Sequence, residues 1–281
     1  MSGVLHIVST PVGNLADISQ RACDILRQVD AVAAEDTRHA GKLLDALGIR
    51  QKLVSYHDHN EQQRTVQLVA RLASGDNLAL VSDAGTPLIS DPGYRLVRAC
   101  HEAGIRVIPV PGASALLAAL VVAGLPTDRF VFEGFLPSKG GGRKTALRRL
   151  AACDATSILY EAPHRILVLL DGLRREAGDD RQAVLCRELT KQFETVLPGT
   201  LAALHAAVTA DSNQQRGEIV LLLGPAPQQT QDEAALRELA RLLRGELPAS
   251  RAAKVLAAWS GRKRSDVYAW LEAEQPGTTD D

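Results

Sequence analysis

The first half of the chain alternates short apolar runs with amphipathic segments. The apolar runs are rich in Val, Ile, Leu and Ala and are bounded by turn-forming residues, as is typical of buried strands. The segments between them place apolar residues at helical spacing. Strands are predicted at 4–9, 31–34, 53–56, 78–82 and 107–110, and helices at 19–29, 38–47, 61–74 and 94–103. Strands that alternate with helices predict crossover connections and a mainly parallel sheet.

A second series of strands and helices follows a long apolar helix, which is expected over 113–123. Gly124 ends this helix and Pro126 prevents its continuation, so we place a domain boundary there. Residues 1–125 then form an N-terminal α/β domain, and 126–227 a second one. In the second, strands are predicted at 130–132, 157–160, 184–187 and 219–223, with helices from about Lys144, His164 and Leu201.

The end of the chain has helical periodicity only and follows a break rich in Pro and Gln at 225–231. Residues 237–268 hold eight Lys or Arg and three acids, a net charge of +5, in a chain whose net charge is −1. Ser250 is expected to cap one of the helices and Gly261 to end it. We predict a basic helical module at 232–281 that contacts RNA phosphates as helix-turn-helix modules do. Packing against a partner subunit is the alternative role.

Composition excludes several classes of protein. Lys and Arg number 32 against 33 Asp and Glu, so the chain is not a basic nucleic-acid coat. Hydrophobic residues make up 46%, too many for a disordered chain. The four cysteines form no C-x-x-C pair, which supports neither a zinc site nor a disulfide framework. The longest apolar run, 115–125, is too short for a membrane span. The N-terminal residues lack the cationic segment that is typical of a signal peptide. We therefore expect a cytoplasmic protein without a membrane partner.

Three loops rich in small residues follow predicted strands. They are Thr10-Pro11-Val12-Gly13, the 82–93 loop with Asp83, and Pro111-Gly112-Ala113-Ser114-Ala115. In open α/β sheets ligands bind at the carboxyl ends of the strands, and glycine there lets a backbone approach closely. The loops therefore predict a ligand cleft. An Asx-turn or a helix cap is the alternative role of Asp83.

Two polar runs suggest other chemistry, but their spacing does not support it. Residues 138–145 suggest a P-loop, yet Arg143 stands between the last Gly and Lys144, so we expect a flexible basic loop. The run 56–61 holds two His and two acids, but adjacent strand residues point to opposite faces. A capped helix start or a substrate contact is therefore favoured over metal binding, and we predict no metal site. The cations of 139–149 form either a solvated helix face or a phosphate contact.

Six motifs occur in order along the chain. They are Thr10-Pro11-Val12-Gly13-Asn14-Leu15, Ala34-Glu35-Asp36-Thr37-Arg38, the loop from Ser82 to Gly93, Gly134-Phe135-Leu136-Pro137, Tyr160-Glu161-Ala162-Pro163-His164-Arg165 and Arg187-Glu188-Leu189-Thr190-Lys191. Each motif alone is weak, whereas six in register are highly specific. By these motifs the chain resembles the tetrapyrrole-methylase-like family of S-adenosylmethionine-dependent methyltransferases, from about Leu5 to Leu223.

The resemblance implies a fold, a cofactor and a reaction. It implies two α/β domains, with a mainly parallel sheet in the first and a mixed sheet in the second, S-adenosyl-L-methionine between them, and a homodimer. The motifs are most similar to those of family members that methylate ribosomal RNA, which implies 2′-O-methylation of a cytidine in the decoding region of small-subunit (16S) RNA. The alternatives are methylation of a small tetrapyrrole and a non-catalytic RNA-binding assembly factor. The basic runs argue against the first alternative, and the intact cofactor loops against the second.

The same resemblance implies cofactor-binding residues at Val12, Gly13, Asp83, Gly85, Thr86, Ser114, Ala115, Tyr160 and Gly217. A ribose hydroxyl is a poor nucleophile that needs a general base or strong orientation. The candidate catalytic bases are carboxylates at strand ends, namely Glu161 and Asp36, with Glu188 as a further candidate. The expected RNA-binding cations are Arg38, Arg143, Lys144, Arg165, Arg187 and Lys191. Interdomain ion pairs are the alternative role of all these charged residues.

Overall fold

The structure, a computed structural model, describes residues 2–227 and 233–273. The chain divides into two compact units, one ending at Ala226 and the other beginning at Pro227. The larger unit contains two five-stranded sheets. The first uses strands from residues 1–125 and the second strands from 126–227, but the division of these ranges into separate domains stays a prediction. The Pro and Gln break lies partly outside the described residues.

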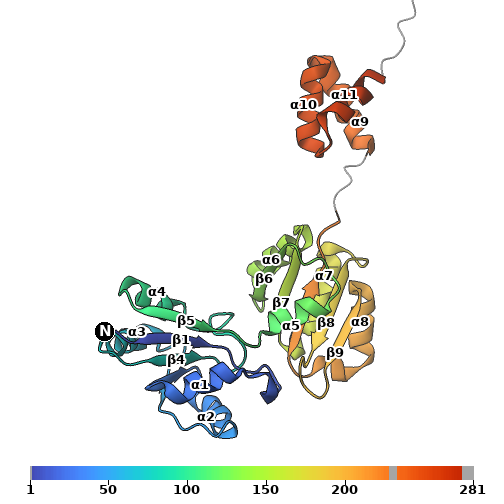
Figure 1. The fold of residues 1–281 in the computed structure, drawn as a ribbon. Coiled ribbons are helices and arrows are strands. Elements are labelled where there is room, and N and C mark those ends of the chain that lie inside the picture. Colours follow the sequence, from blue (N-terminus) through green and yellow to red (C-terminus); the bar gives the residue numbers. More distant parts are fainter. Residues whose placement is uncertain (1, 228–232, 274–281) are drawn as a thin grey trace, which may run out of the picture. The chain divides into compact units, whose positions relative to one another are not determined.

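The first sheet is parallel throughout, which confirms the prediction, and its strand order is β3-β2-β4-β1-β5 (Figure 1). Its strands are β1 (Val4–Val8), β2 (Ala31–Ala34), β3 (Leu53–Ser55), β4 (Leu78–Val81) and β5 (Arg106–Val110). Its helices are α1 (Gln20–Gln28), α2 (Thr37–Ala46), α3 (Glu61–Ala73) and α4 (Tyr94–Glu102). The adjacent residues Val32 and Ala33 belong to different buried clusters, so helices cover both faces of the sheet.

The second sheet is mixed, as the resemblance implied, with strand order β6-β7-β10-β8-β9. Strands β6 and β7 are parallel and the other pairs antiparallel. Its strands are β6 (Phe130–Phe135), β7 (Thr156–Glu161), β8 (Gln182–Arg187), β9 (Thr195–Thr200) and β10 (Ile219–Leu223). Its helices are α5 (Ala115–Val122), α6 (Gly140–Ala152), α7 (Ile166–Ala177) and α8 (Leu201–Ala210).

Two features of the second sheet were not predicted. Strand β9 was missed because Pro198 and Gly199 disfavour strand in a sequence pattern, although an edge strand tolerates them. The expectation of a flexible loop over 138–145 is wrong for most of that run, because α6 begins at Gly140. The Arg143 side chain is buried, donates to the Pro137 carbonyl at 3.1 Å and lies 3.6 Å from the Glu161 carboxylate. These contacts favour the helix although its three glycines have low helix propensity.

The smaller unit contains α9 (Glu233–Glu246), α10 (Ala249–Ser260) and α11 (Arg264–Ala273). These helices share a small apolar core that includes Leu236, Leu256 and Leu271. Gly261 has a left-handed conformation and ends α10, as predicted. The prediction of Ser250 as a cap is wrong, because the helix already begins at Ala249, directly after Pro248. No helix within 2–227 or 233–273 is long and apolar enough to cross a membrane.

Candidate functional site

A cavity of about 460 Å³ lies at the carboxyl-terminal edge of the first sheet and is lined on its other side by residues of the second sheet. The first sheet and its loops contribute Val12, Glu35, Asp83, Ala84, Gly85, Thr86, Ile89, Ser90, Asp91, Ser114 and Ala115. The second contributes Phe135, Tyr160, Glu161, Ala162, Pro163, Gly217, Glu218, Ile219 and Val220. The volume is in the range of small-molecule sites, which is about 300–1,000 Å³. Eight of the nine predicted cofactor residues line it, all but Gly13.

Hydrogen bonds tie the three small-residue loops together at this edge. Thr10 and Gly85 exchange backbone hydrogen bonds of 2.8 and 3.0 Å. The Thr86 hydroxyl lies 2.9 Å from the Ser9 hydroxyl and donates to the Ala113 carbonyl at 3.0 Å. The loops that follow β1, β4 and β5 therefore form one surface, although they are far apart in sequence.

Aromatic side chains form part of the wall from the second sheet. The Tyr160 hydroxyl accepts a hydrogen bond of 3.1 Å from the Leu116 N–H at the start of α5. The rings of Phe132 and Phe135 contact the Tyr160 ring edge-on, with centroids 4.9 and 5.7 Å away. Phe135 lines the cavity and is 57% exposed. Its role was missed in the sequence, although it lies in the motif Gly134-Phe135-Leu136-Pro137.

Two glycines at the site leave no room for a side chain. A Cβ at Gly13 would lie 2.4 Å from Cγ of Lys191, and one at Gly217 would lie 2.4 Å from the Glu188 carboxyl group. Gly217 also has a φ of +76°, which favours glycine. Both glycines therefore allow the loop that carries Glu188 and Lys191 to pack closely against its neighbours.

Backbone strain is concentrated in two loops near the cavity. Within the described residues, the non-glycine residues with positive φ are Leu88, Ser90, Glu188 and Thr190. The first two lie in the loop after β4, and the other two in the loop after β8. Such conformations cost on the order of 1 kcal/mol or more each and persist where the surrounding structure enforces them, as at ligand sites.

Three acids on the first-sheet side of the cavity have no ion pair among the described residues: Glu35, Asp83 and Asp91. The Asp36 N–H donates to Oδ1 of Asp83 at 3.1 Å. Burial, followed by the negative charges of Asp91 and Asp83, raises the pKa of Glu35 to about 7. Burial also raises the pKa of Asp91.

The two predicted catalytic carboxylates have structural partners. Asp36 caps α2 by accepting from the Arg38 N–H at 2.8 Å and forms a 2.7 Å ion pair with the Arg38 side chain. Hydrogen bonds from Arg38 lower the pKa of Asp36, which makes it a weak base, and it lines neither cavity described here. The Glu161 side chain is fully buried and lies 3.0 Å from Arg165 and 3.6 Å from Arg143. It lines the cavity, but its charge is already neutralised.

Most of the predicted RNA-binding cations likewise form ion pairs or hydrogen bonds with other groups of the protein. Arg143 and Arg165 face Glu161, as described above. Arg187 is buried and donates to the Phe193 carbonyl at 2.9 Å. Lys191 lies 2.9 Å from Glu188 and 3.1 Å from Glu218. Lys144 is exposed on α6, and the Arg38 side chain, although paired, is 88% exposed.

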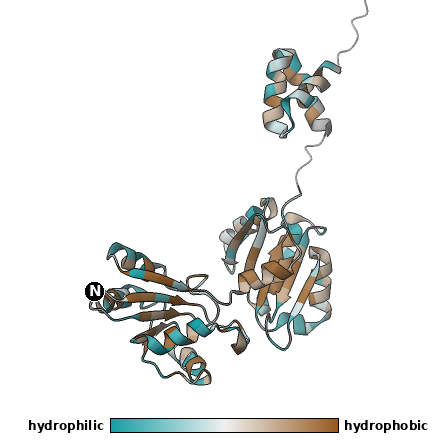
Figure 2. Ribbon diagram, in the orientation of Figure 1, coloured by the Kyte–Doolittle hydropathy of each residue, from teal (hydrophilic) through white to brown (hydrophobic). Residues whose placement is uncertain are grey.

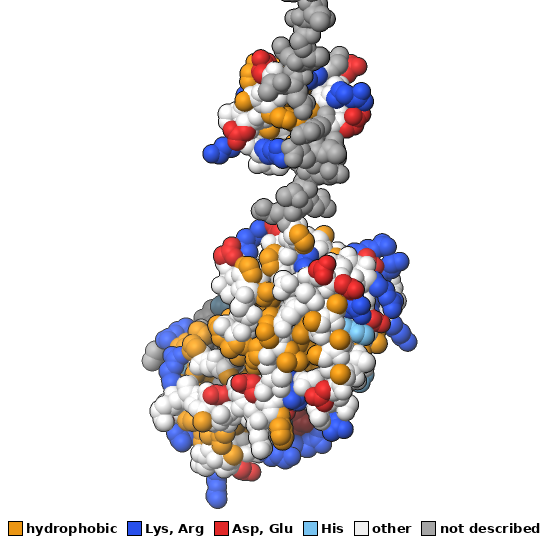
Figure 3. All heavy atoms as spheres, turned by 90° about the vertical axis from the view of Figure 1, so that its right-hand side faces the viewer, with side chains coloured by type: hydrophobic (Ala, Val, Ile, Leu, Met, Phe, Trp, Pro, Cys, Tyr) orange, Lys and Arg blue, Asp and Glu red, His pale blue; other side chains and the backbone are white. Residues whose placement is uncertain are grey.

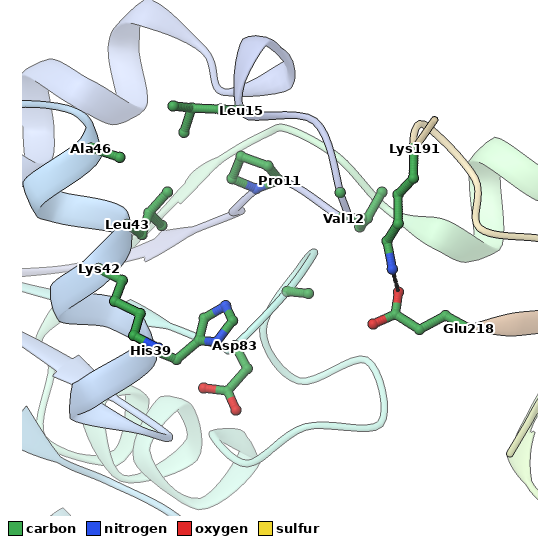
Figure 4. A pocket seen from close by; sticks show the side chains of 12 residues that line it. Pro11, Val12, Leu15, His39, Lys42, Leu43, Ala46, Asp83, Lys191 and Glu218 are labelled. Carbon is green, nitrogen blue, oxygen red and sulfur yellow. Dashed lines mark ion pairs between the residues drawn. The ribbon is translucent and has the colours of Figure 1, made fainter. Parts of the chain in front are cut away.

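A second cavity of about 380 Å³ adjoins the first and shares Val12, Asp83, Ala84 and Glu218 with it. Figure 4 shows His39 and Lys42 projecting from α2 beside Asp83, with Lys191 opposite and directed at Glu218. Gly13 lies in this cavity. His39 and Lys42 were not predicted, although Lys42 follows Arg38 at the helical spacing of four residues.

The residues of the larger cavity fit a nucleoside that carries a sulfonium group. Val12, Ile89 and Val220 give apolar walls for a base, and the unpaired carboxylates favour hydroxyl groups and a positive charge. Gly85 and Gly217 bring backbone close to the cavity. The arrangement can hold such a molecule between the two sheets and exclude water from it.

Family comparisons match both units of the chain. Residues 4–205 match the model of the family described as Tetrapyrrole (Corrin/Porphyrin) Methylases. Residues 230–275 match a model described as RsmI C-terminal HTH domain.

Several relatives and solved structures are similar to the chain. It is 50% identical over 275 residues to ribosomal RNA small subunit methyltransferase I of Escherichia coli O157:H7. The aligned region covers 97% of this chain and 96% of that relative. It is 53% identical over 267 residues to the enzyme of the same name from Xylella fastidiosa strain Temecula1, covering 95% and 98%. The crystal structure of uroporphyrin-III C-methyl transferase from Thermus thermophilus, complexed with S-adenyl homocysteine, matches with a TM-score of 0.55 at 20% identity, over 79% of this chain and 97% of that one.

Proposed function

Because the chain belongs to the tetrapyrrole methylase family and is a methyltransferase, we propose that it transfers a methyl group from S-adenosylmethionine to small-subunit ribosomal RNA. The finer proposal is that the acceptor is the 2′-hydroxyl of a cytidine in the decoding region of 16S RNA. The observation that carries the proposal is the identity of about half of all residues, over nearly the full length, with relatives named ribosomal RNA small subunit methyltransferase I. The two adjoining cavities support it, because methyl transfer needs sites for a donor and an acceptor.

The larger cavity is proposed to hold the cofactor, which supplies an electrophilic methyl group when bound. Val12, Ala115 and Tyr160 contact it through apolar surface, and Asp83 accepts hydrogen bonds from its polar groups. The other proposed contacts are Gly85, Thr86, Ser114 and Gly217 in this cavity, and Gly13, which lines the adjoining smaller cavity. The protein mainly positions the reacting groups and excludes water, since a sulfonium is already a good electrophile.

The smaller cavity is proposed to admit the target nucleotide. A nucleotide in folded RNA must be splayed out before its ribose reaches a cleft, and its phosphates then need positive partners. His39 and Lys42 line this cavity, and Arg38 and Lys144 are exposed. We therefore keep Arg38 and Lys144 as proposed RNA contacts and add Lys42. Arg143, Arg165 and Arg187 are better explained as structural residues, since their guanidinium groups are used within the fold.

The C-terminal unit is proposed to bind RNA through its exposed cations. Arg251, Lys254, Arg262, Lys263 and Arg264 are all exposed on α10, α11 and the turn between them. Removal of 227–281 should leave S-adenosylmethionine affinity unchanged and weaken subunit binding about 10- to 100-fold at moderate salt, with a shallower salt dependence. Filter binding between about 50 and 200 mM salt measures this, because affinity that depends on phosphate contacts falls steeply over that range. Loss of cofactor affinity on truncation would instead indicate a structural role.

A homodimer in the cytoplasm is also proposed, and an apolar surface supports the dimer. Helix α5 is apolar on all sides (Figure 2), and Leu117 and Val121 are 51% and 76% exposed. Phe130 and Val131 on the edge strand β6 are exposed as well. Figure 3 shows apolar side chains gathered on one face of the larger unit rather than scattered singly. Exposed apolar patches of this kind are typical of interfaces.

The test is methyl transfer to isolated small ribosomal subunits that lack this modification. The protein is incubated with labelled S-adenosylmethionine and the subunits, and the RNA is then digested to nucleosides. Label in 2′-O-methylcytidine from the decoding region is expected. Label in a base or in another region would contradict the finer proposal, and label only in an added tetrapyrrole would overturn RNA as the substrate.

A further inference from the structure

We propose that Glu35 is the general base that accepts the proton of the ribose 2′-hydroxyl during methyl transfer. This inference rests on the proposed function and assigns a role that neither Asp36 nor Glu161 can fill in this structure. The hydroxyl oxygen bonds to the methyl carbon, the carbon–sulfur bond breaks with its electron pair left on sulfur, and the proton passes to the Glu35 carboxylate. The products are a methylated ribose and a neutral thioether, and Glu35 then returns its proton to water.

The fold places Glu35 at the larger cavity, which is proposed to hold the cofactor. Strand β2 ends at Ala34, which pairs with Val81 of the neighbouring strand β4, so Glu35 lies beside the start of the Ser82 to Gly93 loop. Glu35 lines the larger cavity. The helix that follows it carries His39 and Lys42 to the smaller cavity, where the nucleotide is proposed to enter.

Three of the other acids of the cavity are less suited to this role. Glu161 is neutralised by two arginines, and Glu218 lies 3.1 Å from Lys191. Asp83 already accepts a hydrogen bond from the Asp36 N–H. A carboxylate held by a cation is a weaker base, because the cation stabilises its ionised form.

The surroundings of Glu35 contain negative charges. Asp83, Asp91 and Asp58 all raise its pKa, and burial contributes most to its value of about 7. A base with such a pKa is ionised in about half of the molecules at neutral pH and binds a proton well in the transition state. Within the described residues, no group of three or more His, Cys, Asp or Glu is placed to hold a metal ion.

The kinetic test compares Glu35→Gln with Glu35→Asp and with Glu102→Gln, a matched change of an exposed glutamate on α4. For the wild type, kcat/KM for small subunits should rise with pH and level off above about 7. Glu35→Gln should lower the rate about 10²- to 10⁴-fold and abolish this rise, while affinities for S-adenosylmethionine and RNA change less than about threefold. Glu35→Asp should recover part of the rate and keep a pH dependence, and Glu102→Gln should match the wild type. A wild-type rate and pH profile in Glu35→Gln would overturn the proposal.

A binding measurement tests the same residue without turnover. A sulfonium bound near Glu35 lowers the pKa of its carboxyl group, so the wild type should release a fraction of a proton when it binds S-adenosylmethionine at pH 7. Calorimetry in two buffers of different ionisation enthalpy gives the number of protons released per bound ligand. Glu35→Gln should release clearly fewer protons, and S-adenosylhomocysteine, which lacks the sulfonium charge, should release fewer from the wild type. Equal release from wild type and Glu35→Gln would show that Glu35 is not the titrating group.

The two experiments separate this inference from the proposed function. If the wild type does not methylate small subunits, the proposed function fails, and with it the role of Glu35 toward ribose, whatever the calorimetry shows. If the wild type is active and Glu35→Gln is equally active, only the role of Glu35 fails. Should Glu35→Gln not fold, Glu35→Asp carries the test, because the moved carboxylate should shift the pH midpoint of kcat/KM.

Discussion

The acids on the two sides of the larger cavity have opposite surroundings. On the first-sheet side, Glu35, Asp83 and Asp91 have no ion pair within the described part of the chain. On the other side, Glu161 contacts two arginines and Glu218 contacts Lys191. A paired carboxylate stabilises the fold, whereas an unpaired one at a cavity keeps its affinity for a proton or a ligand. Glu35 and Glu161, which look equivalent in sequence because each lies at or directly after the end of a strand, therefore have different roles.

The largest expected effect is on the paired side. Glu161→Gln should lower the free energy of unfolding by about 3–5 kcal/mol, because it leaves Arg143 and Arg165 buried or half-buried without their carboxylate. Urea denaturation of the wild type and the variant measures it, with Glu102→Gln as the control. A loss below about 1 kcal/mol would mean that Glu161 contributes little to the fold, which would contradict the stabilising role assigned to the paired acids.

The sequence predicted the architecture well because the architecture depends on local apolar patterns. The five parallel strands of the first sheet follow from the buried runs such as Ala31–Ala34, and Gly261 was a sufficient signal for the end of α10. Strand β9 was missed because edge strands tolerate Pro and Gly. The start of α6 was expected near Lys144 rather than at Gly140, because the buried contact of Arg143 with Glu161 is not visible in the sequence. Patterns of this kind carry no information on such long-range contacts.

The site was predicted less completely, for a related reason. The cofactor residues lie in loops whose small residues are visible in the sequence, and the structure brings these loops together. The choice of base depends instead on counter-charges from distant segments. Arg143 is far from Glu161 in sequence, and Asp91 is far from Glu35, so spacing alone could not show that one acid is neutralised and the other is not.

An intermediate effect is expected for a ligand-facing acid. Asp83→Ala should weaken S-adenosylmethionine binding by about 1–3 kcal/mol, because polar groups of the ligand lose their partner. Its effect on folding should be smaller than that of Glu161→Gln. Calorimetric titration gives the affinity, with Asp45→Ala, a change of an exposed acid on α2, as the control. Unchanged affinity in a folded variant would remove Asp83 from the site and weaken the contrast between the two sides.

The smallest expected effect concerns stability and pH. The folded-state pKa of Glu35 is raised from 4.5 to about 7, so its contribution to stability is present below pH 4.5 and is lost as the pH rises through about 7. Glu35→Gln removes the cost of an ionised carboxylate near Asp83 and Asp91. Relative to the wild type, the variant should therefore gain about 1 kcal/mol of unfolding free energy between pH 5 and pH 8, less than the full linkage value because solvent screens a half-buried group.

Chemical denaturation of both proteins at the two pH values tests this prediction. The sign is informative, because the same substitution is expected to abolish the pH-dependent methylation and to stabilise the fold. An acid kept at a cavity at a cost in stability is more simply explained by chemistry than by packing. A difference between variant and wild type that is the same at pH 5 and pH 8 would show that Glu35 titrates at its ordinary value. Glu35 would then differ from Glu161 only in lacking a partner, and it would have no special affinity for the proton of the ribose hydroxyl.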